Sequence, residues 1–237
     1  MSLTNSFNIL TLFFKALFMT TKNPIEDLKE IRKIMEQSTK FLSLSGISGV
    51  FAGLIALGGS FWAWMEIRQF ENLSLHYYAT GRYDNKLESL ELKLGLIALL
   101  ILVSAISTGV LFTWLKARKQ KRNLFTKLSF KLAISLMVPL AFGGAFTLCL
   151  YKMEAYTLVA PATLIFYGLA LLNASKYVHV DIKYLALSEM ALAVICMYRI
   201  SDGHYGEGLY FWAFGFGVLH IVYGTIMYFK YDRKAVA

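Results

Sequence analysis

The stretch LGLIALLILVSAISTGVLFTWL, residues 94–115, contains no charged side chain. A helix needs about 20 mostly apolar residues to cross roughly 30 Å of hydrocarbon, so this stretch predicts a membrane-spanning helix. Runs 41–65, 132–151 and 155–175 also lack charged side chains, 208–229 contains His220, and 182–200 contains Glu189 with Lys183 and Arg199 at its ends. The sequence therefore predicts six spans.

The composition agrees with this interpretation. Of the 237 residues, 57% are hydrophobic and 16% are charged, against about 25% charged in an ordinary soluble domain. Such a chain is neither disordered nor a disulfide scaffold, because it is rich in apolar residues and has only 2 Cys. The predicted fold is all-α: a polytopic membrane protein with a six-helix transmembrane bundle.

The distribution of Lys and Arg predicts the orientation. If the N-terminus is cytoplasmic, 18 of the 24 basic residues fall on the inner side, as the positive-inside rule requires. We therefore expect both termini to be cytoplasmic. The basic run at residues 116–122 is interpreted as a stop next to a span rather than as a nucleic-acid site. We expect the lipid bilayer as partner, with anionic head groups at the cytoplasmic face, and no nucleic acid.

The first 40 residues divide into two parts. Residues 1–22 form an N-terminal extension that lacks the features of a signal peptide; it is either an interfacial helix or the result of a misassigned start, with Met19 as the alternative. Residues 23–40 predict an amphipathic helix, since Asn23 suits the N-cap and Pro24 the first helical position. This helix either lies on the inner membrane surface or docks a cytoplasmic protein through residues 24–40. The six-span membrane domain follows at 41–230, and a cytoplasmic tail at 231–237.

The stretch RKIMEQSTKFLSLSGISGVFAG, residues 32–53, resembles the opening of a group of uncharacterised bacterial multi-span membrane proteins. The resemblance implies a bacterial inner membrane as the location. It implies no activity, substrate or catalytic residue.

Two ionisable residues fall inside predicted spans. Glu189 lies in the fifth and His220 in the sixth. An ionisable group at mid-membrane costs about 2.5 kcal/mol or more and usually faces the interior of a bundle. The two lie at similar depth and can pair if their faces meet, which predicts a polar pair that stores or relays a proton. The alternative is a neutral Glu189 that hydrogen-bonds across helices.

Small residues recur along the first span. Gly46, Gly49 and Gly53 form a face that allows close helix packing. The segment Gly46-Ile-Ser48-Gly49 also resembles the Gly-x-Ser-Gly pattern of rhomboid intramembrane proteases, in which a histidine on the last core span completes the site. The pattern here lies on the first span rather than the fourth, and the glycine-rich setting of the rhomboid histidine is not reproduced. We favour packing.

The last external loop carries Asp202, His204 and Glu207. Such residues can hold a divalent ion, but ligands on one short loop are more typical of a solvated turn. No sequence motif for a cofactor, a metal or a catalytic residue is found, and we predict none.

Three functions remain open. The first is a non-enzymatic scaffold, sensor or regulatory membrane component. The second is a small proton-linked transporter that uses Glu189 and His220, working as a homo-oligomer. The third is an intramembrane serine hydrolase that uses Ser48 and His220. We rank them in this order.

Overall fold

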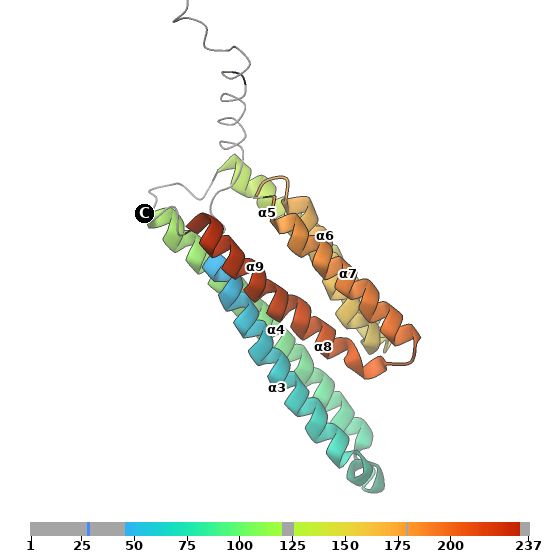
Figure 1. Cartoon of the computed structure of the whole chain (residues 1–237). Coiled ribbons are helices and arrows are strands. Elements are labelled where there is room, and N and C mark those ends of the chain that lie inside the picture. Colours follow the sequence, from blue (N-terminus) through green and yellow to red (C-terminus); the bar gives the residue numbers. More distant parts are fainter. Residues whose placement is uncertain (1–27, 29–45, 120–125, 179, 233–237) are drawn as a thin grey trace, which may run out of the picture. The chain divides into compact units, whose positions relative to one another are not determined.

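In the computed structural model of the chain, residues 28, 46–119, 126–178 and 180–232 are described. The chain divides into two units, Met1–Lys40 and Phe41–Ala237. Of the first unit only Leu28 is described, an exposed helical residue. The predicted extension at 1–22 and most of the predicted helix at 23–40 therefore lie outside the described residues. Everything that follows concerns the second unit (Figure 1).

The described part of this unit is all-helical, and six of its helices are long and apolar enough to cross a membrane. They are α3 (Gly46–Ala79), α4 (Tyr83–Lys119), α5 (Lys127–Lys152), α6 (Val159–Ala174, preceded by the 3-10 turn Tyr156–Leu158), α7 (Ile182–Ser201), and a sixth that begins after the 3-10 turn Tyr205–Glu207 and runs through α8 (Gly208–Ala213), the π-helical segment η3 (Phe214–Leu219), α9 (His220–Met227) and the π-helical segment η4 (Tyr228–Asp232). The prediction of six helices of spanning length is confirmed.

Local sequence explains where several helices begin and end. The side chain of Thr126 caps α5 by accepting a hydrogen bond from the Ser129 amide at 3.1 Å. After α3, Gly81 adopts a positive φ of 66°, and the amides of Gly81 and Arg82 donate to the carbonyls of Tyr78 and Tyr77. Glycine suits this position because it has no Cβ to oppose a left-handed backbone. The reversal places α4 antiparallel to α3.

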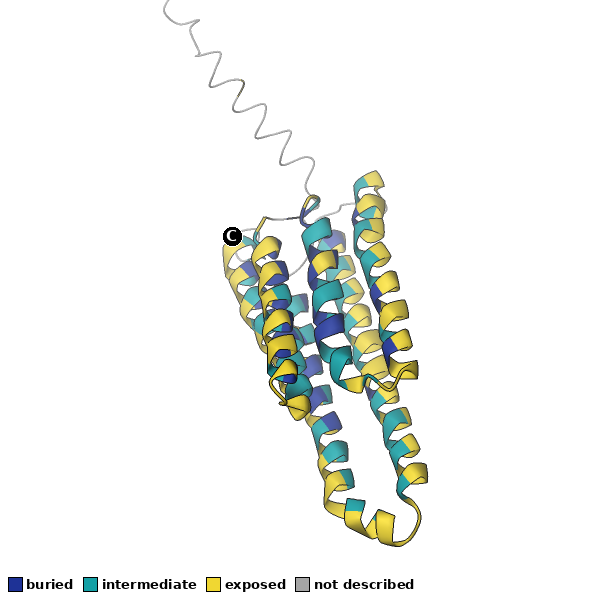
Figure 2. Ribbon diagram, turned by 90° about the vertical axis from the view of Figure 1, so that its right-hand side faces the viewer, coloured by how far each residue is buried: buried dark blue, intermediate teal, exposed yellow. Residues whose placement is uncertain are grey.

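Residues 66–93 differ from the sequence-based expectation. The predicted spans at 41–65 and 94–115 left these residues as the connection between them, but they continue α3 and α4 as regular helix up to the turn. At 1.5 Å per residue the two helices are about 50 and 55 Å long, well beyond the roughly 30 Å that a span needs. Ion pairs between Lys93 and Glu66 (2.8 Å) and between Arg68 and Glu71 (3.5 Å) stabilise helix in a stretch without apolar periodicity. Figure 2 shows that the end of this hairpin is exposed.

The helices have two ends that we name by what lies there. The terminal face is the end at which α3 begins at Gly46 and η4 finishes at Asp232. The hairpin face is the opposite end, with the turns between α3 and α4, α5 and α6, and α7 and α8. Helix α3 packs on α4, and α6 packs on both α5 and α7. The sixth helix lies between these two groups: α9 packs on α3, and α8 contacts α3, α6 and α7 (Figure 1).

Glycines bring α3 and α9 together backbone to backbone. A Cβ on Gly224 would lie 2.6 Å from both the Gly46 oxygen and the Val50 nitrogen, and a Cβ on Gly49 would lie 3.2 Å from the Gly224 Cα. A Cβ on Gly53 would lie 2.6 Å from the Gly217 oxygen. These distances are below ordinary van der Waals contact, so larger residues would force the two backbones apart.

Candidate functional site

Glu189 lies on the buried stripe of α7. The buried residues of this helix recur every three or four positions: Ile182, Leu185, Ala186, Glu189, Ala193, Cys196 and Ile200. This spacing marks one helix face, and Glu189 is its only charged-type residue, with no exposed surface. The position is about 10 Å from the start of α7 at 1.5 Å per residue. The carboxyl group therefore lies inside the protein, in the first half of a helix that is long enough to cross a membrane.

His220 approaches Glu189 from the sixth helix. It is the first residue after the π-helical segment η3, in which the helix takes an extra residue per turn. Segments of this kind occur often at functional sites. The Nδ1 atom of His220 lies 3.0 Å from the carbonyl oxygen of Gly215, within the same segment, and 3.4 Å from Oε1 of Glu189. The structure thus brings together the two ionisable residues that the sequence placed inside spans.

The hydrogen bonds of His220 define its tautomer. A carbonyl oxygen can only accept, so Nδ1 carries a hydrogen and donates it to Gly215. In the neutral ring Nε2 is then an acceptor, and it receives the hydroxyl of Tyr167 at 2.7 Å. Both ring nitrogens are engaged, and the ring is held between α6 and η3.

The carboxyl group of Glu189 is in a different state. Neither of its oxygens makes a hydrogen bond with any described residue, although both are buried. The Nδ1 hydrogen of His220 is directed at Gly215, so the 3.4 Å approach to Oε1 is a close contact without a hydrogen bond. A sealed carboxylate without a donor is costly in free energy. This is the largest unsatisfied polar feature in the described part of the chain.

Gly215 makes room for this carboxyl group. A Cβ at Gly215 would lie 2.5 Å from Oε2 of Glu189, 2.6 Å from a methyl carbon of Leu164 and 3.2 Å from one of Leu192. The absent side chain therefore gives the carboxyl its space, and the carbonyl of the same residue holds His220. One glycine in the π segment contacts both halves of the pair.

The sequence analysis did not identify Tyr167 and Gly215. Tyr167 could have been noticed, because tyrosines in membrane proteins concentrate at the interfaces and this one lies in the middle of an apolar run between Leu164 and Ala170. Its ring also packs on Phe216, with centroids 4.9 Å apart. Gly215 gave no comparable signal, because its role depends on the π-helical geometry.

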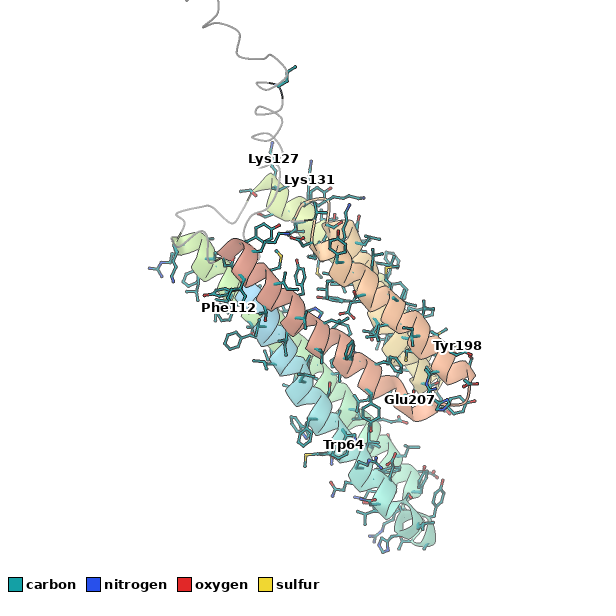
Figure 3. All side chains as sticks on the ribbon, viewed as in Figure 1. Trp64, Phe112, Lys127, Lys131, Tyr198 and Glu207 are labelled. Atoms are coloured by element: carbon teal, nitrogen blue, oxygen red, sulfur yellow. The ribbon has the colours of Figure 1, made fainter. Side chains whose placement is uncertain are left out.

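The residues of the turn between α7 and α8 are engaged locally. Arg199 donates two hydrogen bonds to the carboxylate of Glu207, at 2.6 and 2.8 Å, across the turn between α7 and α8. Figure 3 shows Glu207 at this end of the two helices. Nδ1 of His204 lies 3.8 Å from Asp202. Within residues 46–119, 126–178 and 180–232, no group of three or more His, Cys, Asp or Glu is arranged to hold a metal ion.

The terminal face carries a second polar cluster. Asp181 accepts hydrogen bonds from Lys230 at 2.8 Å and from the hydroxyl of Tyr231 at 2.6 Å. Asp232 accepts from the Gly46 amide at 2.8 Å and from Lys116 at 2.7 Å. The end of the sixth helix is thus tied to the start of α7 on one side and to α3 and α4 on the other.

No family model, no curated protein and no solved structure matches the chain. The class of protein therefore follows from its fold and its site alone. It is an all-helical protein with six helices able to cross a membrane, consistent with a multi-pass membrane protein. Its buried polar site consists of Glu189, His220 and Tyr167 from three different helices.

Proposed function

We propose that this protein is a proton-responsive sensor or regulatory component of a membrane, and that Glu189, His220 and Tyr167 form its proton-binding site. The observation that carries the proposal is the fully buried Glu189, whose two oxygens make no hydrogen bond with a described residue and whose Oε1 lies 3.4 Å from Nδ1 of His220. With the histidine in its Nδ1–H form, a proton on Glu189 leaves the pair without net charge.

Among the residues that the structure describes, no second ion-pair partner compensates a charge on Glu189. Its described ion-pair partner within 4 Å is His220. The other titratable groups on the elements around it that are not exposed are Tyr167 on α6, Tyr223 on α9, and Cys196 and Arg199 on α7, and Arg199 is paired with Glu207. The exposed ones are Lys183, Tyr184 and Tyr198 of α7 and Tyr210 of α8, and residues 46–65 of α3 contain none. Loss of the proton would therefore leave an isolated negative charge in the protein interior, which is unfavourable.

This gives stability a defined pH dependence. In the unfolded chain both side chains are exposed, and Glu loses its proton before His does. The last proton therefore leaves near pH 6.5, the ordinary pKa of histidine. The folded pair resists that loss because of the buried charge, so the folded state binds more protons than the unfolded state above this pH. The free energy of unfolding is then expected to fall as pH rises from 6.5 toward 9.

The test is the melting temperature of the detergent-purified protein between pH 5 and 9. The wild type should lose stability above pH 6.5, and Glu189→Gln should show a flatter curve because its side chain cannot ionise. Glu88→Gln, an exposed residue of α4, is the matched control and should follow the wild type. Equal slopes for the wild type and Glu189→Gln would contradict the proposal.

A proton-linked transporter is the second candidate. It is favoured by the π-helical interruption of the sixth helix beside the site, because interrupted helices line the sites of many transporters. The test is proton flux into liposomes that contain the protein and an internal pH dye, driven by a potassium diffusion potential. Proton flux that is lost in Glu189→Gln would favour the transporter. If the flux does not exceed that of empty liposomes, the transporter is excluded and the sensor is the function that stands.

An intramembrane serine hydrolase finds less support. The two ring nitrogens of His220 are engaged by Tyr167 and Gly215, which leaves neither to activate Ser48. The small residues around Ser48 support close packing, since Gly46 and Gly49 approach the backbone of the sixth helix.

We further propose that the terminal face is cytoplasmic and that the membrane is a bacterial inner membrane. The excess of Lys and Arg on the segments at this face supports the orientation. Figure 3 shows two of these residues, Lys127 and Lys131, at the terminal end of α5, where anionic head groups would meet them. A cytoplasmic partner bound through residues 24–40, and a homo-oligomer, remain part of the proposal.

A further inference from the structure

The two sides of the site differ in what surrounds them. Toward the hairpin face, α6, α7 and α8 pack together (Figure 1). The residues there are closely packed: Leu164 and Ala193 have no exposed surface, and Cys196 is 1% exposed. The hydroxyl of Thr163, at the same level of α6, donates to the carbonyl of Ala160 within its own helix. This side offers a proton no chain of free polar groups among the described residues.

Toward the terminal face the backbone of the sixth helix separates from those of α6 and α7. Here α9 has its close backbone contacts with α3, and Figure 1 shows it diverging from α6 and α7. Side chains fill the space between them: Leu219 of η3, Tyr223 of α9 and Tyr167 of α6 pack against the buried cluster of Leu171, Ile182, Leu185 and Ala186. We call this space the wedge.

The wedge carries hydroxyl groups along the sixth helix. His220 and Tyr223 are three residues apart in α9, which places them on the same side of this helix. Tyr231 follows in the π-helical segment η4. Tyr231 then meets Asp181, which also binds Lys230, at the terminal face. Polar groups therefore lead from the buried pair toward water on this side, with Tyr223 in the middle.

We propose that the site exchanges its proton with water at the terminal face, through the wedge, and is sealed from the hairpin face. The inference rests on the proposed function and adds the side of the membrane to which the site responds. The exchange is a simple transfer: a proton leaves the carboxyl of Glu189 to water that enters beside Tyr223, and returns by the same route. Asp181, Lys230 and Tyr231 form the polar closure of the wedge.

Cysteine accessibility tests this directly. The lipid-exposed Cys149 is replaced in the variant Cys149→Ser, while the buried Cys196 is kept as the natural reporter of the hairpin side. Tyr223→Cys is added as the reporter of the wedge. The protein is reconstituted in liposomes of known orientation, and a charged, membrane-impermeant methanethiosulfonate reagent is applied to one face at a time.

The expected result is modification of Tyr223→Cys from the terminal face and none from the hairpin face, with Cys196 unmodified from both. Asp181→Asn, which weakens the closure, should accelerate the modification. Val222→Cys is the matched control: it is the next residue but half-exposed on the outer surface of α9, so it faces lipid and should not react with a charged reagent. If Tyr223→Cys does not fold, Leu219→Cys takes its place in the same wedge.

Three outcomes would overturn the inference: modification of Cys196 from the hairpin face, modification of the wedge cysteine from that face, or no modification of the wedge cysteine from the terminal face. These outcomes are separate from the fate of the proposed function. A reactive wedge together with a pH-independent Glu189 would remove the proton site and keep the accessible wedge. A titrating Glu189 with an unreactive wedge would keep the proton site and remove the wedge as its route to water.

Discussion

Helices α4 and α7 differ in opposite directions in their hydropathy and in their burial by protein. Of the six membrane-length helices, α4 contains the most apolar window and α7 the least apolar one. Yet α4 buries only Ile97 and Ala117 among its 37 residues, while α7 buries seven residues of 20, including a carboxyl group. Figure 2 shows that much of the helical surface is exposed rather than covered by protein.

The difference shows what hydropathy measures in a membrane protein. Lipid is as apolar as leucine, so a helix that faces lipid must be apolar on every side, and a helix that faces other helices need not be. The most hydrophobic span is therefore the peripheral one. The span with the weaker signal buries one face in the protein, and that face carries the polar group, so it is the place to look for function.

The comparison predicts its largest effect for leucines. Leu185 on α7 is 6% exposed within the protein and Leu99 on α4 is 55% exposed. Leu185→Ala should lower the free energy of unfolding by about 3 kcal/mol, because a packed side chain leaves a cavity. Leu99→Ala should change it by less than about 0.5 kcal/mol, as for exposed positions. Thermal unfolding in detergent measures both, and equal effects would break the distinction between the two helices.

Glycines give the next effect. Gly224→Ala places a methyl group 2.6 Å from backbone atoms of α3, whereas Gly109→Ala on α4 meets nothing within 4 Å. Overpacking against a backbone should cost about 2 kcal/mol. The α4 variant should be neutral or slightly more stable, since alanine favours helix. Melting temperatures of the two variants check this, and an unstable Gly109→Ala would show that α4 is packed against something in the membrane.

Tyrosines should separate the site from the surface. Tyr167→Phe removes the hydroxyl that reaches His220 and leaves Nε2 without its donor, at a cost of about 1.5 kcal/mol for an unsatisfied buried group. Tyr198→Phe on α7, at an exposed position, should cost less than about 0.5 kcal/mol. Denaturation of the two proteins under the same conditions compares them. If both substitutions were neutral, the Tyr167 hydroxyl would contribute nothing to holding the ring.

The smallest effect is expected at the hairpin face. Arg199 and Glu207 form a bidentate pair, but their side chains are 36% and 33% exposed. Arg199→Gln should therefore cost at most about 1 kcal/mol. The loss should shrink further in high salt, because exposed charges are screened. Stability measured at low and high salt tests this; a large, salt-independent loss would indicate a buried role for the pair.

Sequence reasoning recovered the spans because the signal for a span is local. A run such as 94–115 must form all its backbone hydrogen bonds within itself in lipid, and its own residues decide this. The same reasoning underestimated α3 and α4 beyond the membrane. Residues 66–93 lack the apolar run that marks a span, and contacts between the two helices of the hairpin, such as Lys93 with Glu66, form only once the helices lie side by side.

The residues of the site also divide into those that the sequence marks and those that only the fold reveals. The sequence by itself marked Glu189 and His220, because an ionisable residue within a span is expensive and seldom accidental. Only the tertiary structure decided that they meet, that Tyr167 joins them, and that Gly215 gives the carboxyl its room. Which faces of three separate helices oppose each other depends on how the helices pack, and the extra residue of the π segment rotates His220 by an amount that no periodicity in the sequence records.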